Sequence, residues 1–421
     1  MIPLFTVSAD VSPTRPPITS GPVRNQVKIL LLSFYYPPDL CAGSFRAAAL
    51  VEALREVGRD IATIDVMTTR PNRYASHAAA PVADVETVPG LTIRRFNLPP
   101  HQSGIADQMR AYRGYATGVW RATRGRKWDL VVATSSRLMT AALGAEVAKR
   151  MKARFYLDLR DLFTDTASGL FGSKPMRIAL PVFRWLERRT LKVADRVNVV
   201  SPGFVPYLTQ VAQRHDCRVF TNGIDEVFLS EDFCKPDACP SVPRLIVYAG
   251  NIGDGQGLHR ILPEAARAMA GLAHFRLIGD GGRRAELEKS LAAAETTNVT
   301  LLPPVPRESL FEHYREADAL FLHLNHHAAF QKVLPSKIFE YAATGKPIVA
   351  GVAGCAARFL QDEVPGTSLF APCDTTGMVE AVAALADMPA RFDRSLFRAK
   401  FARRRIMKAM AEDILDLAAP G

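Results

Sequence analysis

The sequence lacks the features that identify several common classes of protein. No apolar run approaches the roughly 18 to 20 residues of a membrane-spanning helix, and no basic segment with an apolar core predicts a signal peptide. A Gly-x-Ser-x-Gly elbow and a His-Glu-x-x-His helix are both missing, which removes the usual signals of a serine hydrolase and of a zinc protease. We therefore expect a cytoplasmic protein that touches a membrane at most on its surface.

Patterns typical of metal sites are also scarce. The six cysteines are scattered, and Cys234 and Cys239 do not have the spacing of a zinc knuckle. Reduced thiols of a cytosolic protein are the expected state. No Asp-x-Asp sequence occurs, which argues against a divalent cation that grips a diphosphate. We expect neither a metal nor another cofactor.

The chain contains enough residues for two ordinary globular domains. Its 421 residues are 48% hydrophobic and 23% charged, so each half can bury a core of its own. Lys and Arg number 53 against 42 Asp and Glu, which gives a formal net charge of +11. A surface this basic predicts an anionic partner such as a nucleotide, a nucleic acid or an acidic lipid.

Apolar runs of strand length alternate with helical patterns, which indicates an α/β fold with doubly wound parallel sheets. In the first half, strands are expected at Val27–Leu32, Ile61–Met67, Leu91–Phe96, Leu130–Ala133, Phe155–Leu159 and Arg196–Val200. In the second half they are expected at Leu245–Ala249, Phe275–Ile278, Val299–Leu302, Ala319–Leu324 and Pro347–Ala350. We predict a disordered extension at residues 1–24, domains at 25–225 and 226–392, and a C-terminal helix at 393–421 that packs back on the first domain.

One lysine and one glutamate lie a single helical turn apart in the segment 334–349. Lys337 and Glu340 follow a Pro-Ser helix start, where Ser336 and the first-turn amides favour an anion. The Lys337 ammonium could contact a phosphate, and Glu340 could accept hydrogen bonds from paired sugar hydroxyls. A sugar nucleotide offers both groups, although a capped helix with a solvated ion pair fits the same spacing.

Three loops that follow expected strands are rich in glycine or proline. The loop 35–44 contains Gly43, where the backbone could approach a ligand closely, and a plain strand-to-helix turn is the alternative. Gly250–Gly257 predicts a cradle of backbone amides for an anion, but it matches neither the dinucleotide pattern nor the phosphate loop of ATPases. Gly279–Gly282 is interpreted as a surface turn.

Charged residues follow the strand that ends at Leu159. Asp158, Asp161 and Asp165 surround Arg160, and the last two aspartates lie past the carboxyl end of the strand. Catalytic groups collect at that edge of α/β sheets, although a structural network of salt bridges is the alternative.

Residues 105–127 and 176–196 have the pattern of basic amphipathic helices. Such helices can rest on an anionic bilayer surface. A core-facing helix with a solvated basic side has the same pattern.

Together these segments resemble the family 4 glycosyltransferases of the GT-B fold, in which two Rossmann-like doubly wound domains face each other across a cleft. The similarity is greatest to the bacterial O-antigen and exopolysaccharide branch that includes N-acetyl-fucosamine transferases, and it spans residues 27–415. It is carried by the segments 33–38, 158–162, 199–204, 221–225, 248–253, 302–307 and 334–348.

The resemblance implies a sugar nucleotide held mainly by the second domain, an acceptor on the first, and a metal-independent reaction that retains anomeric configuration. Glu340 matches the glutamate that holds the ribose. Val305 and its neighbours match the segment whose backbone reads the base. Gly43 matches the loop that closes over the diphosphate.

The sequence departs from the family pattern at three places. Lys332 stands where the first glutamate of the motif is expected. Asn251 and Gln256 replace the arginine and lysine of the glycine loop. Arg160 and Asp161 stand where the family has a histidine.

These departures leave the diphosphate short of positive charge. We expect Lys337, with Lys332 and the amides of Gly253–Gly257, to supply it. Asp161 is the candidate for orienting the acceptor or the donor sugar, beside Arg160 as a substrate-binding residue.

We predict a cytoplasmic hexosyltransferase on the inner face of the plasma membrane, without a nucleic-acid partner. It would move an N-acetylated hexosamine-type sugar from a UDP-sugar to a lipid-diphosphate-linked saccharide acceptor. Two alternatives stay open: a catalytically degenerate scaffold of a polysaccharide assembly complex, and a UDP-sugar 2-epimerase.

Overall fold

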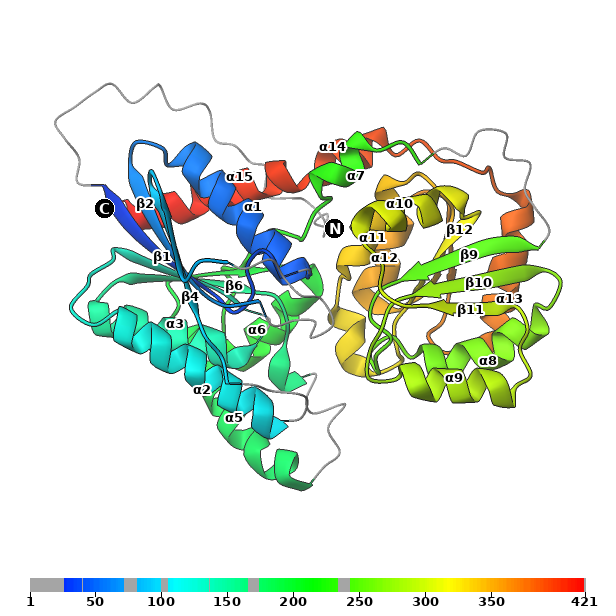
Figure 1. The fold of residues 1–421 in the computed structure, drawn as a ribbon, viewed down its shortest axis with the longest axis horizontal. Coiled ribbons are helices and arrows are strands. Elements are labelled where there is room, and N and C mark those ends of the chain that lie inside the picture. Colours follow the sequence, from blue (N-terminus) through cyan, green and yellow to red (C-terminus); the bar gives the residue numbers. More distant parts are fainter. Residues whose placement is uncertain are drawn as a thin grey trace. The chain divides into compact units, whose positions relative to one another are not determined.

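The chain forms two compact units, each with its own parallel sheet (Figure 1). The computed structural model describes residues 26–39, 41–71, 82–99, 105–135, 137–165, 174–233 and 243–419. The predicted extension at residues 1–24 lies outside these ranges, as do Cys234 and Cys239. The first unit comprises residues 1–222 and 403–421, and the second comprises residues 223–402. The predicted fold class, two doubly wound α/β domains, is confirmed.

The first unit contains an eight-stranded sheet in the order β3-β4-β2-β1-β5-β6-β7-β8. Its strands are β1 (Val27–Ser33), β2 (Ala62–Thr69), β3 (Val85–Val88), β4 (Leu91–Phe96), β5 (Leu130–Ser135), β6 (Arg154–Leu159), β7 (Arg196–Val199) and β8 (Arg218–Val219). All described pairings are parallel except that of β3 with β4. The sequence pattern missed β3 and β8, because a four-residue exposed edge strand and a two-residue strand carry too little apolar periodicity.

Helices cover both faces of this sheet (Figure 1). Helices α1 (Ala42–Val57) and α15 (Arg403–Ala418) pack together on one face. On the other face, α3 (Leu138–Met151) lies between α2 (Ile105–Ala122) and α5 (Lys174–Val193), and α6 (Val205–Ala212) packs on α5. Because both faces are covered, the central strands are mainly apolar, and residues 29–32 are fully buried.

A buried ion pair lies at the centre of the first unit. Arg46, on α1, donates from Nε and Nη2 to the two carboxylate oxygens of Asp158 on β6, at 2.9 Å each. Arg46 also donates to the carbonyl oxygens of Thr221 and Phe220, and Asn198 on β7 donates to the carboxylate. Burial disfavours the ionised carboxyl, but the Arg46 guanidinium holds the pKa of Asp158 below its ordinary value. The pair therefore joins α1 to the second half of the sheet.

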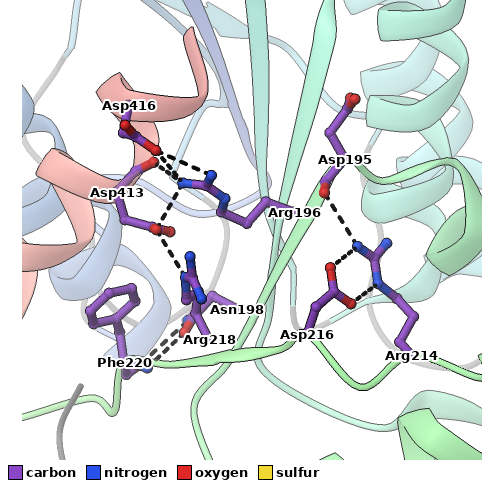
Figure 2. Close-up of polar contacts among 9 residues, drawn as sticks. All are labelled: Asp195, Arg196, Asn198, Arg214, Asp216, Arg218, Phe220, Asp413 and Asp416. Atoms are coloured by element: carbon purple, nitrogen blue, oxygen red, sulfur yellow. Dashed lines mark hydrogen bonds and ion pairs between the residues drawn. The ribbon is translucent and has the colours of Figure 1, made fainter. Parts of the chain in front are cut away.

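Charged residues also tie α15 to the edge of the sheet (Figure 2). Arg196, at the start of β7, donates to the backbone carbonyl and the carboxylate of Asp413, at 2.6 and 2.8 Å, and lies 3.3 Å from Asp416. Arg218, on β8, donates to the same Asp413 carboxylate at 3.0 Å. Strands that are distant in the sequence from α15 thus bind its last turns.

The C-terminal segment is divided between the two units. We expected one segment from residue 393 to 421, but the helix is interrupted at Ala402, which has extended backbone angles. Helix α14 (Ser395–Phe401) packs on α11 (Ser336–Ala343) in the second unit, because Phe397 and Phe401 contact Phe339 and Phe359. The unit boundaries accordingly fall at 222/223 and 402/403 rather than at 225/226 and 392/393.

The second unit contains a six-stranded, all-parallel sheet in the order β11-β10-β9-β12-β13-β14. Its strands are β9 (Arg244–Ala249), β10 (Ala273–Ile278), β11 (Val299–Leu302), β12 (Ala319–His323), β13 (Ile348–Gly351) and β14 (Thr367–Phe370), of which β14 was not predicted. Helices α8 (Leu258–Ala268), α9 (Arg284–Ala293) and α13 (Thr375–Ala383) cover one face. Helices α10 (Arg307–Glu316), α11 and α12 (Gly354–Glu363) cover the other, and the short α7 (Glu226–Ser230) packs on α11.

Each sheet reverses its winding direction at one pair of neighbouring strands. The reversal lies between β1 and β5 in the first unit and between β9 and β12 in the second. Ligands of open α/β sheets bind at the carboxyl ends of the strands that flank such a reversal. Residues that contact a ligand are therefore expected within 33–44 and 135–138 in the first unit, and within 250–257 and 324–325 in the second.

We expect Arg46→Met to lower the free energy of unfolding of the first unit by about 3–5 kcal/mol, because it leaves the Asp158 carboxylate buried and unpaired. Urea unfolding followed by hydrogen exchange in β5 and β6 measures the change. Arg404→Met is the matched control, since Arg404 pairs with Glu56 across the same α1–α15 contact but is 72% exposed, and it should cost less than about 1 kcal/mol. If the two variants lowered the free energy of unfolding equally, the buried Arg46–Asp158 pair would not have the stabilising role given to it here.

Candidate functional site

The loop Gly250–Gly257 and Asn325 lie at the winding reversal of the second sheet, at the carboxyl ends of β9 and β12. Asn325 follows β12 and is 1% exposed. Its backbone amide donates to the Gly255 carbonyl at 2.8 Å, and its side-chain amide donates to the Asp254 carbonyl at 2.9 Å. The loops that follow β9 and β12 are thereby held together at the carboxyl edge of the sheet.

Lys337 lies at the start of the glycine-rich loop. Its ammonium donates to the Ala249 carbonyl, the last of β9, and lies 5.5 Å from the centre of the Tyr248 ring. Gly250 has φ +142°, and a Cβ there would overlap the ammonium. Burial lowers the pKa of Lys337, an effect that the charge of Glu340 opposes. Lys337 is thus a cation with a carbonyl and an aromatic face as described neighbours, and an anion at the loop would favour its charged form.

Glu340 lies one turn further along α11, on the side of the helix that carries Lys337. The residue is half-buried. Its charge acts on Lys337 and on the nearby phenols of Tyr314 and Tyr341, whose rings meet edge to face at 5.7 Å. The Tyr341 hydroxyl accepts the backbone N–H of Ala249 at 3.1 Å. The structure therefore brings Lys337 and Glu340 together at the end of β9, as their spacing predicts.

The two polar residues that depart from the family pattern contact each other. The Asn251 side-chain amide donates to Gln256 Oε1 at 2.8 Å, and the same oxygen accepts the Gly253 backbone N–H at 3.3 Å. A Cβ at Gly253 would collide with Asn251. Asn251 and Gln256 therefore brace the loop from within; Asn251 is exposed and Gln256 is half-buried.

His323, which the sequence analysis did not select, fixes the other end of the loop. The Cys373 backbone N–H donates to His323 Nε2 at 2.9 Å, so Nδ1 carries the proton and donates to the Gln256 carbonyl at 2.6 Å. The residue is 0% exposed, and burial lowers the pKa of His323 to about 4. A neutral imidazole therefore positions Gln256. His323 lies inside an apolar run with no signal of its own, whereas Asn325 could have been found from its place directly after β12.

The loop Gly279–Gly282 leads through a turn into α9, and Asp280 and Gly282 are exposed, as expected of a surface turn, but the loop also packs against this edge. The Gly250 amide donates to the Ile278 carbonyl at 2.8 Å, and the Ile252 amide donates to the Asp280 carbonyl at 2.9 Å. Gly279 and Gly281 have φ +148° and +159°, and a Cβ at either would collide with the backbone of residues 250–252. Glycine is required there because two loops approach each other closely.

The remaining residues predicted in the second unit lie on segments around the same edge. Val305 is half-buried in the connection between β11 and α10. Ser336 is the first residue of α11, and Lys332 ends the short 3-10 helix at Ala328–Lys332. Gly354, at φ +64°, packs on the Gln331 carbonyl and so holds that 3-10 helix against the start of α12.

In the first unit, Gly43 and Arg160 lie against each other. Helix α1 begins at Ala42, not at Phe45 as expected, so Gly43 belongs to its first turn. A Cβ at Gly43 would come within 2.5 Å of Arg160 Nη1. Burial lowers the pKa of Arg160, although the charge of Asp158 opposes this. Asp161 follows directly, half-buried at the carboxyl end of β6.

Two buried polar atoms at this point have no hydrogen-bond partner among the described residues. They are Ser44 Oγ, in the first turn of α1, and Arg160 Nε. The first amides of a helix are themselves free of intrahelical partners and favour anions. The arrangement can therefore bind a negatively charged group beside Asp161.

The described parts of the chain contain neither a cluster of metal ligands nor a helix that could cross a membrane. Across those ranges, no three His, Cys, Asp or Glu side chains gather as a set of metal ligands. Among the helices described, none combines the length and apolar character that crossing a bilayer requires.

Comparisons with known proteins agree with this architecture. Residues 43–223 match the family described as Glycosyl transferase 4-like domain, and residues 243–388 match Glycosyl transferases group 1. WcaI of Escherichia coli (strain K12), which is named as a colanic acid biosynthesis glycosyl transferase, is 23% identical over 337 residues, covering 76% of this chain and 82% of that protein.

Solved structures share the fold over most of its length. Anabaena Alr3699/HepE, crystallised with UDP and glucose, has a TM-score of 0.62 at 16% identity, covering 93% of this chain and 100% of that one. The lipopolysaccharide outer core galactosyltransferase WaaB has a TM-score of 0.58 at 12% identity, covering 93% and 99%.

The two domain matches and the fold make this chain a glycosyltransferase of the GT-B class, with a family 4-like first domain and a group 1 second domain. Within that class it has a homologue in WcaI, a protein named for exopolysaccharide (colanic acid) biosynthesis.

We expect Gly250→Ala to destabilise the second unit by about 1–3 kcal/mol, because alanine is strained at this φ and its methyl group would displace Lys337. Thermal unfolding of the purified variant measures the change. Gly282→Ala, in the adjacent loop, is the matched control, since a Cβ there meets no atom within 4 Å. A Gly250→Ala variant as stable as the wild type would show that Lys337 can leave this position freely.

Proposed function

We propose that this chain transfers an N-acetylated hexosamine-type sugar from a UDP-sugar to a lipid-diphosphate-linked saccharide during assembly of a surface polysaccharide. The observation that carries the proposal is the placement of Lys337 and Glu340 at the glycine-rich loop of a group 1 transferase domain, beside the winding reversal of its sheet. One residue suits a phosphate and the other suits a diol, which are the two parts of a nucleotide diphosphate sugar outside its base.

The donor would lie along the carboxyl edge of the second sheet. Anabaena Alr3699/HepE was solved with UDP, which supports a uridine nucleotide here. We assign the ribose hydroxyls to Glu340 and the base to the backbone around Val305. The diphosphate is assigned to Lys337, Lys332 and the amides that begin at Gly253, with Ser336 at the start of α11 as a further donor.

Lys337 is the group that we expect to stabilise the departing diphosphate. Its neighbours as described are a carbonyl and an aromatic ring, so the ammonium loses hydration without gaining a full counter-charge. A diphosphate provides that charge, and its attraction to the ammonium strengthens as the sugar bond breaks, because negative charge grows on the leaving oxygen. We propose that this cation, with the loop amides, replaces the metal that other transferases use.

The acceptor would bind in the first unit. The start of α1, with Gly43, Ser44 and Arg160, offers amides, a hydroxyl and a guanidinium to an anionic group such as the acceptor diphosphate. Asp161, directly after Arg160, would orient a sugar hydroxyl. We propose a retaining reaction in which the acceptor hydroxyl attacks from the side of the leaving group, and the departing phosphate oxygen takes its proton.

A membrane surface is the proposed location of this acceptor. On α5, Val182 and Trp185 are 63% and 60% exposed, and Met109 and Trp120 on α2 are 47% and 40% exposed. Both helices lie on the same face of the first sheet, on either side of α3 (Figure 1). Arginines accompany the aromatic residues: Arg189 lies 5.6 Å from the Trp185 ring and Arg150 lies 4.0 Å from the Trp120 ring. Exposed apolar groups beside cations suit an anionic leaflet, here the inner face of the plasma membrane.

We expect Lys337→Ala to lower kcat by about a hundredfold, because a transition-state donor of the diphosphate is lost. Release of the nucleoside diphosphate is measured with a panel of UDP-, GDP-, ADP- and dTDP-sugars and a lipid-diphosphate saccharide, with and without EDTA. Lys289→Ala, an exposed residue of α9, should retain normal turnover.

A near-normal rate for Lys337→Ala would remove its assigned role. No UDP release by the wild type with any acceptor would favour a non-catalytic scaffold. Conversion of a UDP-sugar without an acceptor would indicate an epimerase. Loss of activity in EDTA that Mg²⁺ restores would contradict the metal-independent reaction.

We expect the double variant Val182→Ser, Trp185→Ser to lose most of its binding to vesicles that contain anionic phospholipid, because its apolar contact with the bilayer is removed. Co-sedimentation with such vesicles and with zwitterionic vesicles measures binding. Leu396→Ser, at an 86% exposed leucine of the second unit, is the control and should bind as the wild type does. Unchanged binding of the double variant would exclude α5 as the contact.

A further inference from the structure

We propose that Glu187 is a positioning residue that holds the Arg160–Asp161 segment through a shared proton, and that it does so only while its carboxyl is protonated. The effect on catalysis rests on the proposed function. The hydrogen-bonded contact of a protonated Glu187 does not depend on it. Glu187 lies on α5, is 3% exposed, and has no part in the donor or acceptor contacts described above.

Three oxygen atoms form a closed triangle at this point. The Tyr207 hydroxyl, on α6, lies 2.6 Å from Glu187 Oε2 and 2.6 Å from Thr164 Oγ1. Thr164 Oγ1 is also in hydrogen-bond contact with the same Glu187 oxygen. Thr164 is 1% exposed and lies three residues after Asp161. Each oxygen is therefore within hydrogen-bonding distance of the other two.

The count of hydrogen atoms decides the protonation state. Three short O···O contacts need three hydrogens, because two oxygens at 2.6 Å repel each other unless a hydrogen lies between them. The hydroxyls of Thr164 and Tyr207 supply two. A protonated Glu187 supplies the third, and the three groups then form a ring in which each oxygen donates once and accepts once.

The charged groups around the triangle agree with a neutral carboxyl. Burial raises the pKa of Glu187, and the charge of Asp165, on the same turn as Thr164, adds to that rise. The hydroxyls of Thr164 and Tyr207 and the backbone N–H of Thr164 oppose it, but the net direction is upward. Neighbouring guanidiniums on α5 are directed elsewhere: Arg188 donates to the Val211 carbonyl of α6, and Arg189 pairs with Glu146 of α3. The Tyr207 phenol is itself held neutral, since burial raises its pKa.

A second contact shows that α5 is the support of the catalytic segment. Phe163 meets Phe183, one turn before Glu187, edge to face at 5.4 Å. The turn that follows Asp161 is thus attached to α5 by one aromatic pair and one hydrogen-bonded triangle. Ionisation of Glu187 would remove the third hydrogen, open the Thr164–Tyr207 contact, and leave Arg160 and Asp161 less firmly placed.

The sign of the pH dependence follows from this arrangement. A carboxyl with a raised pKa in the folded protein stabilises the fold below its unfolded pKa of about 4.3, and this stabilisation is lost as pH rises through the folded pKa. Placement of the Asp161 segment should therefore weaken as pH rises through the raised pKa of Glu187. Glu187→Gln, which stays neutral and can still donate, should not weaken.

The test compares three variants of the full chain. We expect kcat of the wild type to fall as pH rises through the raised pKa of Glu187. Glu187→Gln should lack this fall and should keep kcat within about threefold of the wild-type value at the pH where the wild type is most active. Thr164→Val should lower kcat by about ten- to a hundredfold with the donor KM unchanged, because small misplacements of catalytic groups are costly. Glu146→Gln, an exposed carboxyl on the neighbouring helix α3, should leave both the rate and its pH profile as in the wild type.

Two measurements are independent of any transferase activity. Infrared spectra should show a protonated-carboxyl band in the wild type that is absent from Glu187→Gln. Hydrogen exchange of residues 160–165 should accelerate as pH rises, beyond the intrinsic rate, in the wild type only. Absence of that band, or a Glu187→Gln variant as impaired as Thr164→Val, would overturn the proposal. If the band and the exchange behave as expected but no acceptor is glycosylated, the proposed function fails and the shared proton stands.

Discussion

Parallel pairing of neighbouring strands is the constraint on which both units depend. Because every strand except β3 runs the same way, the loops that follow the strands all emerge at one edge of each sheet. The reversal of winding then opens a crevice at that edge, between β9 and β12 in the second unit. Gly250, Gly279 and Asn325 are distant in the sequence, yet their backbones meet there. Close packing of these loops requires glycine, and it brings Lys337 to the first of them.

Three ionisable groups in the interior of this protein have three different kinds of partner. Asp158 is ionised because Arg46 pairs with both of its oxygens. Glu187 has only hydroxyls as hydrogen-bond partners in its triangle, and the geometry there calls for a neutral carboxyl. The Lys337 ammonium donates a hydrogen bond to the Ala249 carbonyl and lies beside a glycine-rich loop whose amides can attract an anion. A fully paired charge stabilises the fold, whereas an incompletely compensated charge at a loop is suited to a ligand.

Much of the fold could be predicted because apolar strands between two helical layers have a strong signal. The expected strands at Leu91–Phe96 and Val299–Leu302 agree with β4 and β11 at both ends. Short edge strands were missed, since β3 and β8 bury little apolar surface. Helix α1 begins three residues before its predicted start, because Gly43 was treated as part of the loop. Of the site, Lys337 and Glu340 could be selected from their spacing on one helix, while His323 and Glu187 could not, because nothing local marks a buried polar residue.

The sequence by itself determined the α/β class, the two domains and the helix that presents Lys337 and Glu340, because each depends on patterns within a few turns of chain. The tertiary structure decided which charged groups meet. Arg160 is the nearest arginine to Asp158 in the sequence, but the partner is Arg46, 112 residues away. Thr164, Glu187 and Tyr207 come from three separate elements. Contacts of this kind depend on how helices pack on the sheet, and spacing along the chain does not record that packing.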